Sequence, residues 1–380
     1  MNEQGKKVPT LRFKGFTNDW EQRKLGDIVE NYDSKRIPIK EKDRKHGKYP
    51  YYGATGIIDY IDQYIFDGEY LLLAEDGANI VDRTSPITYI TEGKFWLNNH
   101  AHIMNSDQVD LLFLKASLDK LKYDKFNTGT AQPKLNAKVV SHIKLNIPSR
   151  TEQNRIARML NNLEKLITLQ QRKLDLLKQL KKGLLQKMFA EKNSKQPALR
   201  FKGFHDDWEQ RKVSDIFTVT RGQVLATTKI SEVKTNEMCF PVYSSQTKNN
   251  GLMGYYNKYL FNTAITWTTD GANAGTVNYR EGKFYSTNVN GVLLSDDGYA
   301  NKAIAEILDR VAWRHVSRVG NPKLMNNVMS NIKISIPSSF EEQNAISEFL
   351  IKFDHLIVLH QRKQNHLKLL KKSLLQQMFM

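Results

Sequence analysis

Cysteine is almost missing from this chain: Cys239 is the only one in 380 residues. A single cysteine excludes an internal disulfide framework and a cysteine-rich zinc site, and it is typical of a reducing compartment. Long apolar runs are missing too, since no stretch approaches the roughly 18 residues of a membrane span and the first ten residues hold no apolar signal region. We therefore expect a cytoplasmic or nuclear protein without a membrane partner.

The motifs of cofactor-dependent catalysis are also absent. The sequence has no G-x-x-x-x-G-K-[ST] phosphate loop, no G-x-G-x-x-G after a predicted strand, and no Asn/Asp-Pro-Pro-aromatic motif of amino-methyltransferases. Asn321-Pro322-Lys323 lacks the aromatic residue of the last motif. His100 and His102 would share one side of a strand without a third ligand, so we interpret them as packed or base-contacting residues rather than a metal site. We predict no cofactor and no catalytic residue in this chain.

One segment has the spacing of a magnesium nuclease, Asp82…Glu92-Gly93-Lys94. The second half of the chain offers Asp270…Glu281-Gly282-Lys283, with the first acidic residue shifted by one place. A metal site would not tolerate that shift, whereas a turn with charged flanks would. We therefore interpret both segments as turns, and keep a self-sufficient metal-dependent DNA nuclease as the alternative.

Basic residues exceed acidic ones by 17, which points to an acidic partner, most often nucleic acid. The excess is +3 over residues 1–151, +6 over 152–192, +5 over 193–341 and +3 over 342–380. The second and fourth segments therefore hold nine of the 17 charges in about a fifth of the chain. A solvated helix face and a surface for phosphates or an acidic partner both remain open as explanations.

Those two segments repeat each other. Residues 152–189 align without a gap with residues 342–379, and 21 of the 38 positions are identical. Neither copy contains proline, and apolar residues recur at alternating steps of four and three, which is the pattern of a heptad seam. We predict two long helices whose seams pair. The polar positions expected to fix their register are Gln170, His360, Lys181 and Lys371.

The duplication extends beyond the helices. Residues 11–24 return as residues 199–212, and the pieces EGKF and DGAN recur in both halves. Because the period is about 190 residues, the unit is one domain plus one helix. We expect domains at 1–151 and 193–341, a long helix with a polar linker (190–197) at 152–192, and a second long helix at 342–380. The copies diverge most at residues 31–70 and 219–262, so a shared frame encloses two different interiors.

Each domain is predicted to combine strands with one helix. Short strands are expected at 70–74, 87–90 and 95–98, with Gly93 in a hairpin turn between the last two. The helix is expected at 108–125 in the first domain and at 300–319 in the second, where Arg310, Arg314 and Arg318 would form a basic stripe. Thr151 and Ser338 or Ser339 are expected to cap the long helices.

Residues suited to DNA contact follow the predicted turns. Lysine and arginine neutralise phosphates, asparagine and glutamine pair with adenine, and arginine pairs with guanine. Any one of them is more often an ordinary turn or solvated residue, so only their clustering suggests an interface. The candidates in the first domain are Lys35, Arg36, Lys40, Arg44, Lys45, Tyr51, Tyr52, Asn79, Arg83, Asn98, Asn99 and Gln132. Those in the second are Arg221, Gln223, Tyr243, Gln246, Asn249, Asn273, Asn288, Asn290, Arg314 and Arg318.

The order of these features resembles the specificity subunit of type I restriction–modification enzymes. Each copy opens on Trp-Glu-Gln-Arg-Lys, at Trp20 and Trp208, and closes on Ile-Pro…Glu-Gln-x-x-Ile, at Ile147…Ile156 and Ile336…Ile346. A Gly-Thr-Ala-Gln-Pro-Lys-Leu element spans residues 129–135, but its second copy at 320–324 reads Gly-Asn-Pro-Lys-Leu and has no counterpart of Gln132.

The resemblance implies an α/β fold with two similar target recognition domains in a pseudo-two-fold internal repeat, separated by two long helices that form an antiparallel coiled coil. It implies that each domain reads half of a bipartite double-stranded DNA target. It also implies no catalysis in this chain, because the methyltransferase (M) subunits bind S-adenosylmethionine and the restriction (R) subunits use ATP and Mg. Besides the nuclease, a coiled-coil scaffold that binds only protein remains an alternative.

Overall fold

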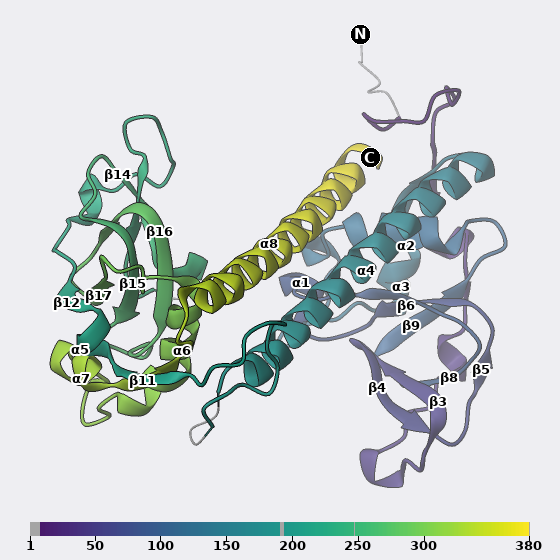
Figure 1. Ribbon diagram of the computed structural model, residues 1–380. Helices are drawn as coiled ribbons and strands as arrows, with labels where there is room; N and C mark the ends of the chain where they lie inside the picture. Colours follow the sequence, from purple (N-terminus) through teal and green to yellow (C-terminus); the bar gives the residue numbers. More distant parts are fainter. Residues whose placement is uncertain (1–7, 191–193, 247, 380) are drawn as a thin grey trace. The chain divides into compact units, whose positions relative to one another are not determined.

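The computed structural model describes residues 8–190, 194–246 and 248–379, which form two compact units (Figure 1). The first comprises the described residues up to Arg172 together with those from Arg362 onward, and the second comprises those between Lys173 and Gln361. The boundary falls inside both long helices, α4 (Arg150–Met188) and α8 (Phe340–Gln377). Each unit therefore holds one domain, the start of that domain's own helix and the end of the other helix. Residues 191–193 of the expected linker lie outside the described residues.

The first unit has two four-stranded sheets. In one the strand order is β2 (Glu30–Asn31), β9 (Ala101–Asn105), β6 (Tyr70–Ala74), β7 (Thr88–Thr91), and in the other it is β4 (Gly56–Ile61), β3 (His46–Gly53), β8 (Lys94–Leu97), β5 (Phe66–Asp67). A two-stranded ribbon pairs β1 (Glu21–Lys24) with β10 (Lys144–Ile147), and the short helices are α1 (Asn79–Asp82), α2 (Leu111–Lys120) and α3 (Ala137–Ser141). Residues of α2 share the main apolar core with Leu71 and Leu73 of β6.

The second unit repeats this plan with one continuous sheet. Its six strands lie in the order β12 (Thr218–Arg221), β17 (Asn290–Leu294), β15 (Phe261–Thr268), β16 (Val277–Ser286), β13 (Phe240–Tyr243), β14 (Leu252–Tyr256). The ribbon pairs β11 (Glu209–Lys212) with β18 (Lys333–Ile336), and the helices are α5 (Val213–Ile216), α6 (Lys302–Ala312) and α7 (Asn326–Asn331). The predicted fold class, two similar α/β domains with two long helices, is confirmed.

The segment around Gly93 is not a hairpin. β7 pairs with β6 and β8 pairs with β3 and β5, so the two strands belong to different sheets. In the second unit the same stretch is the single strand β16. Gly93 and Gly282 both have φ +73°, a conformation that favours glycine. In the second unit the glycine therefore lies within a strand that keeps its direction, and the chain does not turn back on itself there. The local sequence pattern does not distinguish such a bend from a hairpin.

The domain helices are shorter than predicted. Asp110 accepts a hydrogen bond from Phe113 N–H (2.9 Å) and starts α2, while Asn301 accepts one from Ile304 N–H (3.1 Å) and starts α6. Because α6 ends at Ala312, the predicted basic stripe of Arg310, Arg314 and Arg318 does not lie on one helix. Arg310 instead donates to Leu185 O of α4 (2.9 Å).

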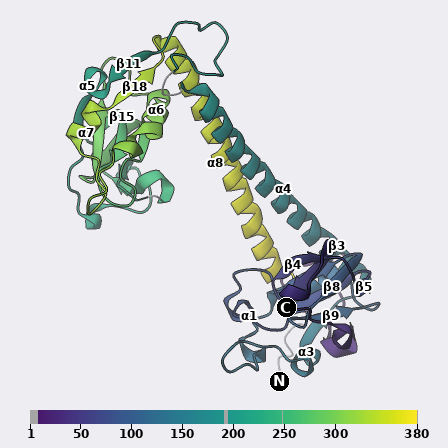
Figure 2. The ribbon, with the colours of Figure 1, turned by 90° about the horizontal axis from the view of Figure 1, so that it is seen from below.

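The long helices match the repeat closely. The seam residues are buried or half-buried, and the two helices lie antiparallel within each unit (Figure 2). In the first unit Lys371 of α8 pairs with Glu164 of α4, and in the second Lys181 of α4 pairs with Asp354 of α8 (2.6 Å). The two ion pairs occupy equivalent positions of the repeat, which confirms the lysines as polar contacts of the seam. Ser339 Oγ caps α8 as predicted (3.2 Å to Glu342 N), whereas Thr151 lies inside α4 and does not cap it.

Each helix ends in an aromatic socket. Phe379 packs edge-on against Trp20 and stacks on Phe113 in the first unit, and Phe189 packs edge-on against Trp208 in the second. Both tryptophans belong to the repeated Trp-Glu-Gln-Arg-Lys motif and are almost fully buried. The repeated opening motif therefore forms the site that receives the end of a long helix.

A buried arginine–glutamate pair anchors the start of each long helix. Arg12 Nε and Nη2 lie 2.7 and 2.8 Å from the two carboxylate oxygens of Glu152, and Arg200 lies 2.7 Å from both oxygens of Glu342. The side chains of both glutamates are only 1% exposed. The arginines come from the repeated Leu-Arg-Phe-Lys-Gly-Phe segment, so this segment and the Glu-Gln motif form one junction.

We predict that Arg12→Ala lowers the free energy of unfolding by about 3–5 kcal/mol, because it leaves the buried Glu152 carboxylate without a partner. Arg211→Ala is the matched control, since the Arg211–Glu209 pair is exposed and should contribute at most about 1 kcal/mol. Urea unfolding of the full chain measures both. Equal, small losses would contradict an anchoring role for Arg12.

Candidate nucleic-acid interface

The basic loop of the first unit is divided between exposed and structural side chains. Lys35, Lys40 and Lys45 are exposed. Arg44 is half-buried: its guanidinium lies over the Tyr51 ring (4.5 Å) and its Nε donates to Ile39 O (3.2 Å). Tyr51 is itself 1% exposed, so only part of the predicted aromatic and basic cluster faces solvent.

Arg36 belongs to a cluster of partly buried charges. Its Nη1 lies 2.7 Å from Glu75 and 2.8 Å from Ala101 O. Asp33 accepts from Ile103 N–H (2.9 Å) and lies 2.6 Å from Nδ1 of the buried His102. Burial by itself raises the pKa of Asp33, but the hydrogen bond and charge of His102 and the hydrogen bond from Ile103 N–H outweigh it and hold that pKa below its ordinary value.

His102 also joins this cluster to the Pro-Lys-Leu element, since its Nε2 lies 2.7 Å from Leu135 O. In the second unit Trp267 Nε1–H donates to the equivalent Leu324 O (3.0 Å). Backbone bonds repeat as well: Gly77 N–H donates to Pro133 O (3.0 Å) and Gly271 N–H to Pro322 O (2.9 Å). The repeated DGAN and Pro-Lys-Leu segments therefore hold each other in both units.

Several other first-unit candidates have structural partners. Asn79 closes a loop by bonding Ser85 N–H (2.9 Å) and Ser85 O (3.0 Å). Arg83 donates to Asp119 O and lies over the Tyr123 ring, and the buried Asn98 accepts from His100 N–H (2.8 Å). Tyr52 is half-buried against Phe95, whereas Asn99 and Gln132 are exposed.

In the second unit, predicted residues gather around a polar cavity of about 100 Å³. Every lining side chain that the structure describes carries a hydrogen-bonding group: five hydroxyls, five amides and one guanidinium. Gln246, Asn273 and Asn290 are among the predicted candidates that line it, and Tyr243 lies beside it under Arg280. Among the described residues no carboxylate lines the cavity, so the described part of its surface combines one positive charge with neutral donors and acceptors.

Arg280 is the residue of this cavity that the sequence analysis missed. It is 6% exposed, its Nε donates to Thr266 Oγ1 (3.1 Å), and its guanidinium lies 3.8 Å from the centre of the Tyr243 ring. Burial lowers the pKa of Arg280 to about 10, and no described aspartate or glutamate pairs with it. Its position directly before Glu281-Gly282-Lys283 was a usable signal, but that stretch was interpreted as a turn.

The remaining second-unit candidates are exposed and do not line this cavity. They are Arg221, Gln223, Asn249, Asn288, Arg314 and Arg318. Arg221 donates to Asn288 O (3.2 Å), and Asn249 has φ +50°, a left-handed conformation that asparagine tolerates better than most residues. These side chains therefore do not belong to the cluster that lines the cavity with Arg280.

The nuclease-like segments do not correspond between the units. Asp76 forms an isolated bridge with Lys134, and Asp270 forms the same bridge with Lys323, so Asp270 is the counterpart of Asp76 and not of Asp82. Among residues 8–190, 194–246 and 248–379, no group of three or more His, Cys, Asp or Glu side chains is placed to hold a metal ion. Within the same residues, no helix is long and apolar enough to cross a membrane.

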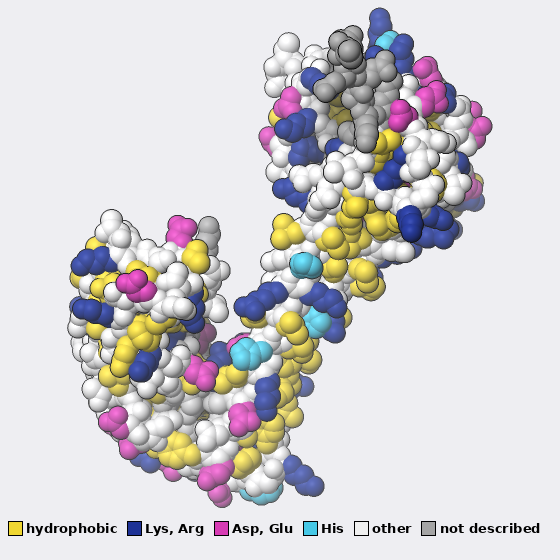
Figure 3. Space-filling view, turned by 90° about the horizontal axis from the view of Figure 1, so that it is seen from above, with side chains coloured by type: hydrophobic (Ala, Val, Ile, Leu, Met, Phe, Trp, Pro, Cys, Tyr) yellow, Lys and Arg dark blue, Asp and Glu magenta, His cyan; other side chains and the backbone are white. Residues whose placement is uncertain are grey.

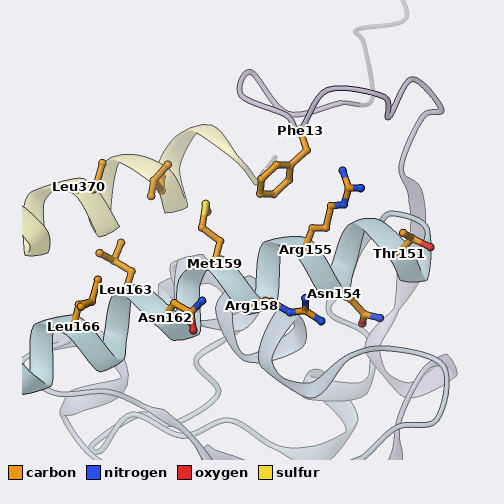
Figure 4. A pocket seen from close by; sticks show the side chains of 11 residues that line it. Phe13, Thr151, Asn154, Arg155, Arg158, Met159, Asn162, Leu163, Leu166 and Leu370 are labelled. Atoms are coloured by element: carbon orange, nitrogen blue, oxygen red, sulfur yellow. The ribbon is translucent and has the colours of Figure 1, made fainter.

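A largely apolar groove of about 760 Å³ lies along the helices of the first unit (Figure 4). Phe13 covers one end of it, Met159 and Leu163 of α4 and Leu370 of α8 line it, and Arg155 stands at its rim.

Apolar side chains also gather on the exposed faces of both helices (Figure 3). These faces are distinct from the seam, because their leucines remain half or more exposed at Leu166, Leu169, Leu176, Leu180, Leu359 and Leu369.

The family model for the type I restriction modification DNA specificity domain matches this chain twice, at residues 17–179 and 205–369. The chain belongs to this family. Each match spans one domain and most of the long helix that follows it, so the family's repeating element is the domain–helix unit described above.

Curated members of the family share parts of the chain. A putative type I restriction enzyme specificity subunit of Haemophilus influenzae is 32% identical over 40% of this chain, and the match spans 38% of that relative. A putative specificity subunit of Mycoplasma pneumoniae is 32% identical over 60% of the chain and 82% of its own length. The MjaVIII specificity subunit of Methanocaldococcus jannaschii is 22% identical over 94% of the chain and 91% of its own length.

The fold has a solved counterpart in the type I restriction–modification S subunit from M. genitalium. The two chains superpose with a TM-score of 0.76 at 15% identity, over 98% of this chain and 99% of the other. At this identity the likeness establishes the fold.

We predict that Asp33→Asn destabilises the first unit by about 1–3 kcal/mol at pH 7, because it leaves a buried hydrogen-bonded cluster incomplete. The pKa of Asp33 is lower in the folded than in the unfolded chain, so its contribution is present above the unfolded value near 4 and is lost as pH falls through the folded value. The difference between wild type and variant should therefore shrink on acidification. Urea unfolding at several pH values measures it, with the exposed Asp107→Asn as control.

Proposed function

We propose that this chain is the DNA sequence-specificity subunit of a type I restriction–modification complex. In this proposal it binds a bipartite double-stranded DNA target and recruits methyltransferase and restriction subunits. The observation that carries it is the duplicated domain–helix unit, matched twice by the family model, whose two copies share a frame and differ inside. Two domains with the same frame and different interiors are suited to reading two different half-sites.

Some contacts occur in both units and form the shared frame, whereas others occur in only one unit and form its interior. The Arg–Glu junction, the aromatic socket and the Pro-Lys-Leu contacts recur in both units with nearly the same distances. By contrast, the charged cluster around His102 occurs in the first unit and the polar cavity around Arg280 in the second. Arg36 belongs to the first of these, and Gln246 and Asn290 line the second, which supports the idea that residues of the interior set specificity.

We further propose that the chain itself is not catalytic and acts in the cytoplasm. Its sequence lacks the motifs for nucleotide and S-adenosylmethionine chemistry. In the complex, S-adenosylmethionine would be bound by the methyltransferase subunits, and ATP and Mg by the restriction subunits. The alternative of a self-sufficient nuclease has no support, because Asp270 corresponds to Asp76 and not to Asp82 of the nuclease-like spacing.

The surface we propose for partner subunits is the exposed apolar side of the long helices. Its leucines repeat with the period of the chain, as Leu166 with Leu356, Leu169 with Leu359, and Leu180 with Leu370. Contiguous exposed apolar residues of this kind mark protein-binding surfaces. The repetition is suited to two copies of one partner, each bound to one equivalent surface.

The first test of the proposed function is an exchange of modules. If residues 1–151 are replaced by those of a related chain, one half of the methylated DNA motif should change and the other half should stay. Exchange of residues 193–341 should do the reverse. Mapping of methylated adenine in a host genome that expresses the chain with its methyltransferase subunits gives the motif. A change of both halves by one exchange would contradict modular reading.

The second test concerns the partner surface. Leu169→Glu combined with Leu359→Glu should weaken binding of the methyltransferase subunit by about 30-fold or more, the effect of losing about 2 kcal/mol at an interface hot spot. Val233→Glu is the control, since Val233 is equally exposed but lies in a loop of the second domain. Size-exclusion chromatography and binding titration of purified chains measure the effect. Unchanged binding of the double variant would exclude this surface.

A further inference from the structure

The two units differ at one equivalent face of their sheets. In the first unit Leu72 stands between Tyr89 and Ile103, and in the second Thr266 stands between Asn278 and Val292. The same registers make Thr91 the counterpart of Arg280 and Ala101 the counterpart of Asn290. The first unit can therefore be compared, position by position, with the part of the second unit that forms the cavity around Arg280.

In the first unit the side chains on this face are mostly apolar, although Thr91, at the place of Arg280, is buried there as well. The apolar side chains form one buried cluster of Phe66, Leu72, Phe95, Leu97, Ala101 and Ile103. The fold therefore does not require a polar interior at this place. In the second unit Ala264, Phe284 and Val292 keep a smaller apolar cluster. Tyr243, which packs against that cluster, lies under a guanidinium that pairs with no described carboxylate, and burial of such a charge is unfavourable for stability. A polar interior that the fold does not require, and that lowers stability, indicates a binding role.

The size of the cavity limits what it can take. Sites for cofactors and other small molecules usually have about 300–1,000 Å³, whereas this cavity has about 100 Å³. It is therefore suited to a projecting part of a larger molecule. For a DNA ligand the candidates are the edge of a base and a phosphate group.

The lining favours a base. A phosphate offers only acceptors, but the five amides and five hydroxyls of the cavity present acceptors as well as donors. A base edge carries both kinds of group. The planar fork of arginine matches the O6 and N7 atoms of guanine. Thr266 accepts a hydrogen bond from the Nε–H of the Arg280 fork, and the Tyr243 side chain lies beside it.

We propose that Arg280 reads a guanine in the half-site recognised by the second unit, with the amides around it contacting the same base pair or its neighbour. This inference rests on the proposed function and deepens it. It assigns to the second unit a specificity determinant that the first unit lacks, since Thr91 stands at the equivalent position.

The test uses Arg280→Gln in the complex with the methyltransferase subunits, and Arg211→Gln, an exposed arginine of the same unit, as control. Methylated-adenine maps should show that the variant loses the requirement for one G·C pair in the second-unit half-site and keeps the other half-site unchanged. The control should methylate the wild-type motif. The module exchange described above identifies which half-site belongs to the second unit.

Binding titrations with synthetic duplexes then test the contact itself. Replacement of that G·C pair by A·T should weaken binding of the wild-type complex about 5- to 150-fold. It should weaken binding of the variant less than twofold. Substitution of 7-deazaguanine, which lacks the N7 acceptor, should weaken the wild-type complex and leave the variant unaffected. Thermal unfolding of the variant should occur at the wild-type temperature or above it, since a buried charge without a carboxylate partner has been removed.

Three results would overturn the inference: a second-unit half-site without a G·C pair, an unchanged motif for the variant, or a uniform loss of affinity for all duplexes. An unchanged motif together with a lower unfolding temperature would make Arg280 structural, and a uniform loss of affinity would make it a phosphate contact. Failure of the wild-type complex to give any bipartite motif would instead contradict the proposed function, so the two failures are distinguishable.

Discussion

The buried ion pair between an arginine and the first turn of a long helix is the contact on which each unit depends. Glu152 and Glu342 lie where the helix dipole favours a negative charge, but both are removed from water and therefore need a cation. Arg12 and Arg200 supply it from the segment that opens each domain. The neighbouring glutamines complete the junction, because Gln153 donates to Pro148 O and Gln343 to Pro337 O.

This junction gives a structural reason for the recurrence of the Leu-Arg-Phe-Lys-Gly-Phe and Glu-Gln motifs in both halves of the chain. The ribbon formed by β1 and β10, or by β11 and β18, leads directly into the helix, so a fixed helix start also fixes the domain that precedes it. Trp20 and Trp208 then close the core around the end of a helix. With the frame held in this way, the inner face of the sheet is free to vary. It is largely apolar in one unit, whereas in the other a smaller apolar cluster lies beside a polar cavity.

The sequence predicted the features that depend on periodic or repeated patterns. The long helices, their seam and the duplication were correct because heptad spacing and long identical stretches are specific signals. The turn at Gly93 was wrong because a glycine with positive φ serves a bend as well as a hairpin. Arg36 and Arg280 show a different limit: whether an arginine meets a carboxylate depends on residues such as Glu75 that are distant in sequence. No local pattern distinguishes the paired arginine from the unpaired one.

The position of the unit boundary inside both helices has a consequence for synthesis of the protein. The core of the first unit includes Met378 and Phe379, which follow the equivalent residues of the first helix by 190 positions. A ribosome adds about 5–20 residues per second, so roughly 10–40 s pass between completion of the first helix and completion of the first unit's core. During this interval Trp20 and Phe113 have no helix end to cover them. The domain that is made first therefore cannot complete its core until the end of the second long helix has been made.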